Sequence, residues 1–513
     1  MEFTGILDLH KNPNEDTIRP VFYTDLNIDR ILSEIFREWG EEVGEYYYFP
    51  ADGESEDYRR AVYRDIRANR LYDALYTFRR HIMNAVVCNE RRDESEIVLQ
   101  KAAWNIYCAA EYTDAVLSLK AALCECELKS AGMRGLFDFL CEYTSATEFE
   151  ELRSETCELS SMLSDMKLRI TFENNRFTVE SLHKEASGDT TDYEAMLHLM
   201  YPDNNRILKT PFDETDGLTK LERSLLSVFV KKEPSFFGRA EAFEKKHTEY
   251  MAGEFLKLSQ ELGFYLSFYR FEIKFEAKGL AFSTPSVDEN AVISATGLYD
   301  LALACENIER NGEPGVVSND FRYEGNESFF VLTGPNQGGK TTFARSLGQL
   351  VFFTKMGLEV PAASANLHYF NDLLTHFSVE ESVETGRGKL KDELIRLAPM
   401  MEAKYDRSFI VINELFTTAA NYDACIMGKK VLERFIGQSC MGIYVTHLPE
   451  LCDAHESVTG INAVIGADGH PSFKISREKS ECAEKSAERV EKHRLGYDQL
   501  CERLKNLRTG QNA

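Results

Sequence analysis

Residues 333–342, TGPNQGGKTT, constrain the fold of this chain more than any other stretch of its sequence. Residues 334–341 fit the pattern G-x-x-x-x-G-K-[ST] of a phosphate-binding loop. The apolar run SFFVLTG before the loop is typical of a buried strand, and TFARSLGQLVFFTK after it is expected to form a helix. The glycines let backbone N–H groups converge on phosphate oxygens, and the N-terminus of the helix adds its dipole. This segment therefore predicts a strand–loop–helix unit that binds a nucleotide.

The chemistry of such a loop gives individual side chains a role. Lys340 is expected to reach the β- and γ-phosphates of ATP, and Thr341 is expected to bind Mg²⁺ through its hydroxyl. The nucleotide contacts predicted in this segment are Gly334, Pro335, Asn336, Gly338, Gly339, Lys340, Thr341 and Thr342.

A phosphate-binding loop also needs an acidic element at the end of a neighbouring strand. The best candidate is FIVINE, residues 409–414, in which Glu414 would polarise the attacking water. Asn413 stands where an aspartate commonly supports Mg²⁺, so we expect Thr341, Asn413 and Glu414 to form the magnesium site. His447 follows another apolar strand in YVTHLPEL, where an imidazole would contact the γ-phosphate. The predicted catalytic residues are Lys340, Glu414 and His447.

The length of the chain, 513 residues, exceeds what one hydrophobic core usually organises, so several domains are expected. The first 160 residues are mostly helical in pattern, and KLRITFENNRFTVESL predicts a strand–turn–strand hairpin. Residues 241–279 are compatible with one helix of about forty residues or with two. After about residue 300 apolar strands alternate with helices, which is typical of a largely parallel sheet.

We therefore predict a multidomain α and α/β protein. Its expected parts are a helical core domain (1–160), a small β and loop insert (161–221), long lever helices (222–280), an ABC-type P-loop ATPase domain with a largely parallel sheet (281–475) and a C-terminal helical tail (476–513).

Composition limits the kind of partner and compartment. The formal net charge is −25, so the chain cannot coat DNA indiscriminately, and any nucleic-acid contact must come from local basic patches. No apolar run approaches the roughly 18–20 residues that span a bilayer, and the N-terminus lacks a signal pattern. The twelve cysteines form no CxxC pair, which argues against a zinc site and for a reducing compartment. We expect a cytoplasmic protein without a membrane partner.

The ordered motifs resemble those of the MutS family of DNA mismatch repair ATPases. TGPNQGGKTT is similar to the family's loop TGPNMGGKST, and VVSNDF resembles the segment that lies against the adenine, with Asn319 and Asp320 on its matching positions. GLEVPA, NELFTTAANYDA and VTHLPEL follow in the family's order. The resemblance covers roughly residues 300–455 well and the helical region more weakly.

The resemblance implies further roles. It places Glu414 on the general base and His447 on a histidine that senses the γ-phosphate. It places Asp423 on a loop that communicates across a dimer, and Asn319 on the adenine side of the nucleotide. A homodimer is implied, with each nucleotide capped by the signature loop of the other subunit.

Three departures from the family pattern bear on function. Asn413 replaces an aspartate, which removes a charge from the magnesium site. In GRGKLKDEL, Gly388 replaces the signature serine, and the neighbouring Lys389 would supply positive charge in its place or be a solvated lysine. The family's mismatch-reading segment is not found, so a short member without that domain is expected.

Together these observations favour an ATPase that drives a DNA-binding clamp, with mismatched, branched or other structured duplex DNA as partner. Repair or recombination control is expected rather than direct mismatch reading. The alternative is a nucleotide-gated interaction module whose cargo is a protein or a ribonucleoprotein. A small-molecule kinase fits the order of the motifs poorly.

Overall fold

The chain forms two compact units. A computed structural model describes residues 5–7, 20–39, 44, 46–47, 53–95, 98–173, 176–182, 228–378, 389–466 and 469–477. One unit, here called the helical unit, comprises Met1–Ile6 and Asp65–Leu262; the other, the sheet unit, comprises Leu7–Arg64 and Gly263–Ala513. One of the three divisions lies between Ile6 and Leu7, and the other two fall inside helices, α3 (Gly53–Ala68) and α11 (Gly253–Glu276). The chain therefore mixes helical and α/β parts, as its sequence predicts.

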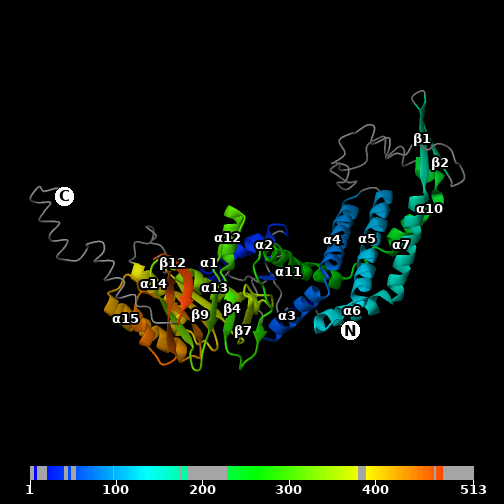
Figure 1. Ribbon diagram of the computed structural model, residues 1–513. Helices are drawn as coiled ribbons and strands as arrows, with labels where there is room; N and C mark the ends of the chain where they lie inside the picture. Colours follow the sequence, from blue (N-terminus) through cyan, green and yellow to red (C-terminus); the bar gives the residue numbers. More distant parts are fainter. Residues whose placement is uncertain are drawn as a thin grey trace, which may run out of the picture. The chain divides into compact units, whose positions relative to one another are not determined.

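The helical unit is built around aromatic side chains. Phe255 is fully buried, and its ring contacts Phe78, Tyr112 and Tyr143 at centroid distances of 6.0, 6.0 and 5.0 Å. These rings come from three other helices of the unit, so the Phe255 side chain joins four elements. These helices are labelled in Figure 1. None of the helices within the described residues is long and apolar enough to cross a membrane. Besides the parts of α3 and α11 that belong to it, the helical unit contains α4 (Tyr72–Glu94), α5 (Val98–Cys124), α6 (Ala131–Thr144), α7 (Thr147–Asp165) and α10 (Pro234–Lys246).

Two local predictions are decided in this unit. The predicted hairpin is confirmed, because β1 (Lys167–Glu173) and β2 (Arg176–Leu182) pair antiparallel. The segment compatible with one helix or two forms two, α10 and α11. The link between them is tied to α5, since the Asn105 amide donates to the His247 carbonyl at 2.8 Å and the Ala252 N–H donates to the Tyr112 hydroxyl at 3.2 Å.

The sheet unit contains a six-stranded sheet in the order β12-β11-β6-β10-β9-β8. The five strands from β11 to β8 pair in parallel, and β12 is antiparallel to β11. Every residue of β6 and β9 is buried, as expected for strands covered on both faces. The strands are β6 (Phe329–Thr333), β8 (Leu373–Phe377), β9 (Phe409–Asn413), β10 (Met441–Val445), β11 (Val458–Ile465) and β12 (Pro471–Ser476).

A smaller sheet and several helices complete this unit. The second sheet has the order β3-β7-β4-β5. Its strands are β3 (Ser286–Val287), β4 (Ser294–Leu298), β5 (Asn319–Arg322) and β7 (Ser364–Leu367). The helices, besides the parts of α3 and α11 that belong here, are α1 (Phe22–Asp25), α2 (Ile28–Phe36), α12 (Leu301–Asn311), α13 (Lys340–Lys355), α14 (Lys389–Glu402), α15 (Asn421–Ile436) and the 3₁₀ turn η2 (Pro449–Asp453).

Helix α13 is the central helix of the sheet unit, and a buried amide fixes it. The Gln349 side chain donates to the Leu26 carbonyl at 3.0 Å and to the Asp300 carboxylate at 2.8 Å, and it accepts from the Leu301 N–H at 2.9 Å. Residues 7–64 therefore cluster with α13 in the sheet unit. The expected helical domain 1–160 spans this division between the units.

Other expected parts are described only in places. The expected insert 161–221 is described up to residue 182, except for residues 174–175. The expected tail 476–513 lies outside the described residues, apart from Ser476 and Arg477.

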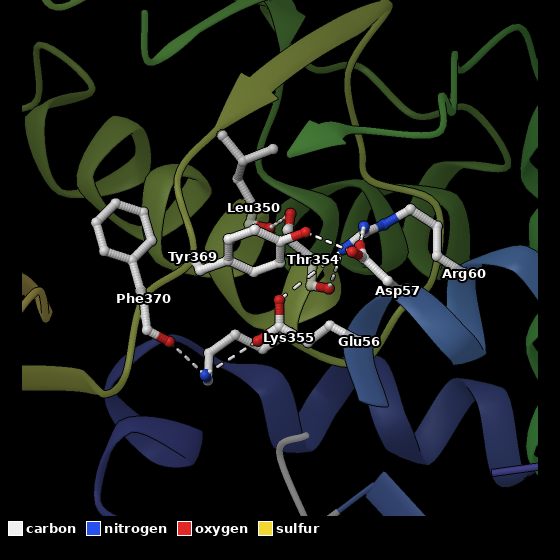
Figure 2. A network of polar contacts seen from close by, with 8 residues as sticks. All are labelled: Glu56, Asp57, Arg60, Leu350, Thr354, Lys355, Tyr369 and Phe370. Carbon is white, nitrogen blue, oxygen red and sulfur yellow. Dashed lines mark hydrogen bonds and ion pairs between the residues drawn. The ribbon is translucent and has the colours of Figure 1, made fainter. Parts of the chain in front are cut away.

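The C-terminal end of α13 is held by a buried ion pair (Figure 2). The Lys355 ammonium lies 3.2 Å from the Glu56 carboxylate of α3, and it also donates to the Phe370 carbonyl. Arg60 lies 3.9 Å from Glu56 and donates to the Thr354 carbonyl at 3.4 Å. Glu56 and Lys355 are only 1% and 6% exposed, so water screens their attraction little. The helix that begins at the phosphate-binding loop thus ends at a buried carboxyl group on α3.

This ion pair predicts a pH effect on stability. Burial raises the pKa of Glu56 from its ordinary 4.5 to about 7, against the opposing pull of Lys355 and Arg60. Between pH 4.5 and pH 7 the folded protein therefore binds one more proton than the unfolded chain. The stability that this proton contributes is fully present below pH 4.5 and is lost as the pH rises towards 7. Relative to Glu56→Gln, the wild-type free energy of unfolding should fall by on the order of 3 kcal/mol over that range. Urea unfolding of both proteins at several pH values measures this, and a pH-independent difference would contradict it.

Candidate functional site

The loop at residues 334–339 joins β6 to α13 and has no room for side chains at two of its glycines. Gly334 has φ +133°, and a Cβ built there would lie 3.0 Å from the Cβ of Ala463 on β11. A Cβ at Gly338 would lie 3.0 Å from the Pro335 carbonyl oxygen. Only glycine fits where the loop packs this closely against β11 and itself. The backbone N–H groups at the start of α13 are thereby available to an anion.

Lys340 is buried within this loop. Its ammonium donates to the carbonyl oxygens of Gly334 and Pro335, both at 2.9 Å, and the residue is 5% exposed. Burial lowers the pKa of Lys340, and the Glu414 carboxylate acts in the opposite direction. A cation held by two carbonyl dipoles at a helix N-terminus suits the binding of a polyphosphate.

The predicted magnesium residues come together at the end of β9. The Thr341 hydroxyl donates to the Asn413 side-chain oxygen at 3.1 Å, which joins the first turn of α13 to β9. Within the described residues no group of three or more His, Cys, Asp or Glu side chains forms a metal cluster. Mg²⁺ commonly uses one or two protein oxygens, with waters and substrate phosphates as the other ligands. The oxygens of Thr341, Asn413 and Glu414 fit that kind of site.

Glu414 and His447 form a pair at the carboxyl ends of β9 and β10. The Glu414 backbone has φ +54°, and its N–H donates to the Val445 carbonyl at 2.9 Å. His447 Nε2 lies 3.1 Å from Glu414 Oε1, and the two side chains are 43% and 32% exposed. A carboxylate at this distance from an imidazole, with access to solvent, is placed to orient a water molecule.

These side chains line one cavity of about 510 Å³, a size suited to a small organic ligand. Residues 336–342, Glu414 and His447 form its polar part. The rest of the lining includes an apolar part that suits the ring of a base. This part is formed by Leu298, Tyr299, Leu303, Val316, Val317 and Phe473.

Phe473 is a cavity residue that the sequence did not reveal. Its backbone has the positive φ of +57°, its side chain is 47% exposed, and its ring lies against Gly339. Such a backbone is uncommon for a bulky residue and is often found at functional sites. The Asn319 amide holds the strand at and just after Phe473, donating to the Phe473 carbonyl at 3.1 Å and accepting from the Ile475 N–H at 2.9 Å. Asn319 therefore lines the cavity with its polar atoms engaged by β12.

We predict that Phe473→Ala weakens ATP binding by roughly 5–30-fold, because stacking of a base on an aromatic ring contributes on the order of 1–2 kcal/mol. The rate of hydrolysis at saturating ATP should change by less than threefold, since Phe473 is expected to contact the base and not the attacking water. Equilibrium binding of ATP and of inorganic triphosphate separates the two effects. Equal weakening for both ligands would contradict a role in contacting the base.

Gly334, Pro335 and Asn413 do not themselves line the cavity, but they accept hydrogen bonds from the lining residues Lys340 and Thr341. Three further predicted residues have no described place in the cavity within this chain. Asp423 is exposed in the first turn of α15 and is not among the residues that line the cavity. Gly388 lies outside the described residues, and Lys389 is described only as the first residue of α14. Their roles at a dimer interface stay predictions.

Comparison with known proteins supports the motif assignment over part of the chain. The family model described as MutS domain V matches residues 330–481, which include β6 to β12 of the large sheet. The DNA mismatch repair protein MutS of Dinoroseobacter shibae is 24% identical over 188 residues, covering 36% of this chain and 21% of that protein. The DNA mismatch repair protein MSH6 of Arabidopsis thaliana is 30% identical over 162 residues, covering 31% of this chain and 12% of that protein. The DNA mismatch repair protein spellchecker 1 of Drosophila melanogaster is 25% identical over 165 residues, covering 32% and 18%.

Over this part of its length, the chain matches the MutS domain V model and is similar to these DNA mismatch repair proteins. The resemblance read from the motifs is thereby confirmed. The matched regions span at most 21% of the length of these three relatives.

Proposed function

We propose that this chain binds ATP with Mg²⁺ in the cavity of the sheet unit and hydrolyses it. One observation carries the proposal, which is the convergence of three chemical elements on a single cavity. These are a glycine loop at a helix N-terminus, the Thr341 hydroxyl, which is hydrogen-bonded to Asn413 beside the cavity, and the Glu414–His447 pair. Each element alone occurs in many proteins, but together they supply phosphate binding, a metal ligand and a group that orients water, which are the parts that phosphoryl transfer to water uses.

In this mechanism each side chain acts at a stated position. Lys340 and the N–H groups at the start of α13 bind the phosphate oxygens, while Thr341 and Asn413 would hold Mg²⁺. When bound, Mg²⁺ would neutralise the charge that develops on those oxygens. Glu414 accepts a proton from the attacking water, and His447 orients the Glu414 carboxylate through their 3.1 Å contact and contacts the γ-phosphate.

We further propose that the chain works as a homodimer acting on DNA. The relatives that it matches carry names of DNA mismatch repair proteins. In the proposed dimer Gly388, Lys389 and Asp423 of one subunit face the nucleotide of the other, and ATP favours a closed state. The long helices would carry this change to a clamp on structured DNA, in repair or in the control of recombination.

The net charge of −25 favours a second candidate, in which the cargo is a protein or a ribonucleoprotein rather than DNA. Both candidates share the same nucleotide site. They differ in the salt dependence of cargo binding, because a DNA clamp releases counterions from the phosphates that it contacts.

The deciding experiment measures Mg²⁺-dependent ATP hydrolysis by wild type and by Lys340→Ala, with and without duplex, branched and single-stranded DNA. We expect hydrolysis in the wild type only, stimulation by at least one DNA structure, and a dimer by light scattering with ATP. Absence of ATP binding would overturn the enzyme assignment. Hydrolysis without any salt-sensitive DNA binding would favour the second candidate.

A further inference from the structure

A buried carboxylate outside the cavity holds the turn that carries Glu414. Glu393 lies in the second turn of α14 and is 4% exposed. Its Oε2 accepts a hydrogen bond from the backbone N–H of Phe416 at 3.2 Å. A buried carboxylate is costly unless it is hydrogen-bonded, so this hydrogen bond helps to fix Glu393 and the backbone at Phe416 relative to each other.

The turn that receives this bond has an unusual backbone. Glu414 and Phe416 have φ values of +54° and +64°, which are unfavourable for residues other than glycine. Such a conformation persists only where its surroundings hold it. Here the Glu414 N–H donates to the Val445 carbonyl on β10, and the Phe416 N–H donates to Glu393 on α14. The turn is therefore held from two elements, one at each end.

Helix α14 is itself bound to the edge of the large sheet. His376 Nε2 on β8 lies 3.3 Å from the Glu393 carbonyl oxygen, and Arg396 donates to the Phe377 carbonyl at 2.9 Å. Strand β8 pairs in parallel with β9, so that Phe377 stands opposite Asn413. A shift of α14 relative to the sheet would accordingly alter the Glu393–Phe416 contact.

We infer that Glu393 is a positioning residue for ATP hydrolysis, which fixes the left-handed turn and thereby aims the Glu414 carboxylate. This inference rests on the proposed function, because it assigns Glu393 an action through the proposed base. It makes the position of α14 a determinant of the hydrolysis rate and leaves nucleotide affinity unaffected, since Glu393 does not line the cavity.

The test compares Glu393→Met, which removes the acceptor at similar volume, with Glu393→Gln, which keeps an oxygen acceptor. We expect Glu393→Met to lower kcat by roughly 10–100-fold, because small misplacements of a catalytic group have effects of this size. The dissociation constant for ATP should stay within twofold, and Glu393→Gln should retain kcat within about threefold. A fall in kcat of less than twofold for Glu393→Met, or equal falls in both variants, would overturn the inference.

A second variant covers the case in which Glu393→Met does not fold, as judged by circular dichroism. Glu393→Asp keeps the charge but shortens the reach, so its kcat should fall about tenfold with unchanged ATP affinity. An unchanged kcat in a folded Glu393→Asp protein would count against the inference.

A double variant separates this inference from the proposed function. In single-turnover assays, Glu393→Met should cause no further loss in the Glu414→Gln background, because both changes act on one group. Multiplying losses would overturn the positioning role while leaving Glu414 as the base. Wild-type turnover in Glu414→Gln alone would instead overturn the role of Glu414.

Discussion

Replacement of Glu414 by glutamine is expected to lower the rate of ATP hydrolysis by about 10²–10⁴-fold while leaving ATP affinity within threefold. Glutamine has the same shape and can still contact His447, but its amide cannot accept the proton of the attacking water. Lys340, proposed to bind the phosphates, and Thr341, proposed to hold Mg²⁺, are unchanged. We therefore expect the variant to accumulate as an ATP-bound, closed dimer.

Single-turnover hydrolysis of radiolabelled ATP, equilibrium binding and light scattering together measure this outcome. Glu450→Gln is a matched control, because Glu450 is an exposed glutamate on η2 that does not line the cavity. The control should behave as wild type. Wild-type turnover in Glu414→Gln would remove Glu414 from its catalytic role.

Replacement of Lys355 by methionine is expected to reduce the free energy of unfolding of the sheet unit by about 3 kcal/mol at pH 8. Glu56 is 1% exposed, and the substitution leaves its carboxylate buried without its nearest cation, with Arg60 at 3.9 Å as partial compensation. The loss should shrink at pH 5, where Glu56 is protonated in both proteins. The double variant Glu56→Gln, Lys355→Met should recover part of the loss, because no charge stays buried.

The two tryptophans of the chain make this measurement specific. Trp39 belongs to the sheet unit and Trp104 to the helical unit, so a Trp104→Phe background leaves Trp39 as the reporter of the sheet unit. Urea unfolding of this background, with and without Lys355→Met, gives the difference in free energy. The exposed Lys404 provides the control Lys404→Met, which should lie within about 0.5 kcal/mol of the background. A similar small effect of Lys355→Met would contradict a stabilising ion pair.

The sequence by itself determined the features that depend on neighbouring residues. Alternating polarity around a short polar turn predicted the β1–β2 hairpin, and an apolar run followed by glycines and a lysine predicted the loop between β6 and α13. Glu414 and His447 were also predicted from the sequence, because Glu414 directly follows a buried strand and His447 lies two residues after another. The carboxyl ends of neighbouring parallel strands lie at the same edge of a sheet, so the sequence pattern alone places these two side chains close together. In the structure they lie 3.1 Å apart.

Only the tertiary structure decided which distant residues support this site. The pairs Glu56–Lys355 and Asn319–Phe473 join residues separated by 299 and 154 positions in the chain. Glu393, on helix α14, contacts the turn that follows Glu414. No local pattern marks Phe473, because its place beside Gly339 results from the antiparallel pairing of β12 with β11. Local sequence sets the conformation of a strand, a turn or a helix through steric and hydrophobic preferences. Which charged or aromatic side chains then meet depends on how the finished elements pack, and that is a property of the whole unit.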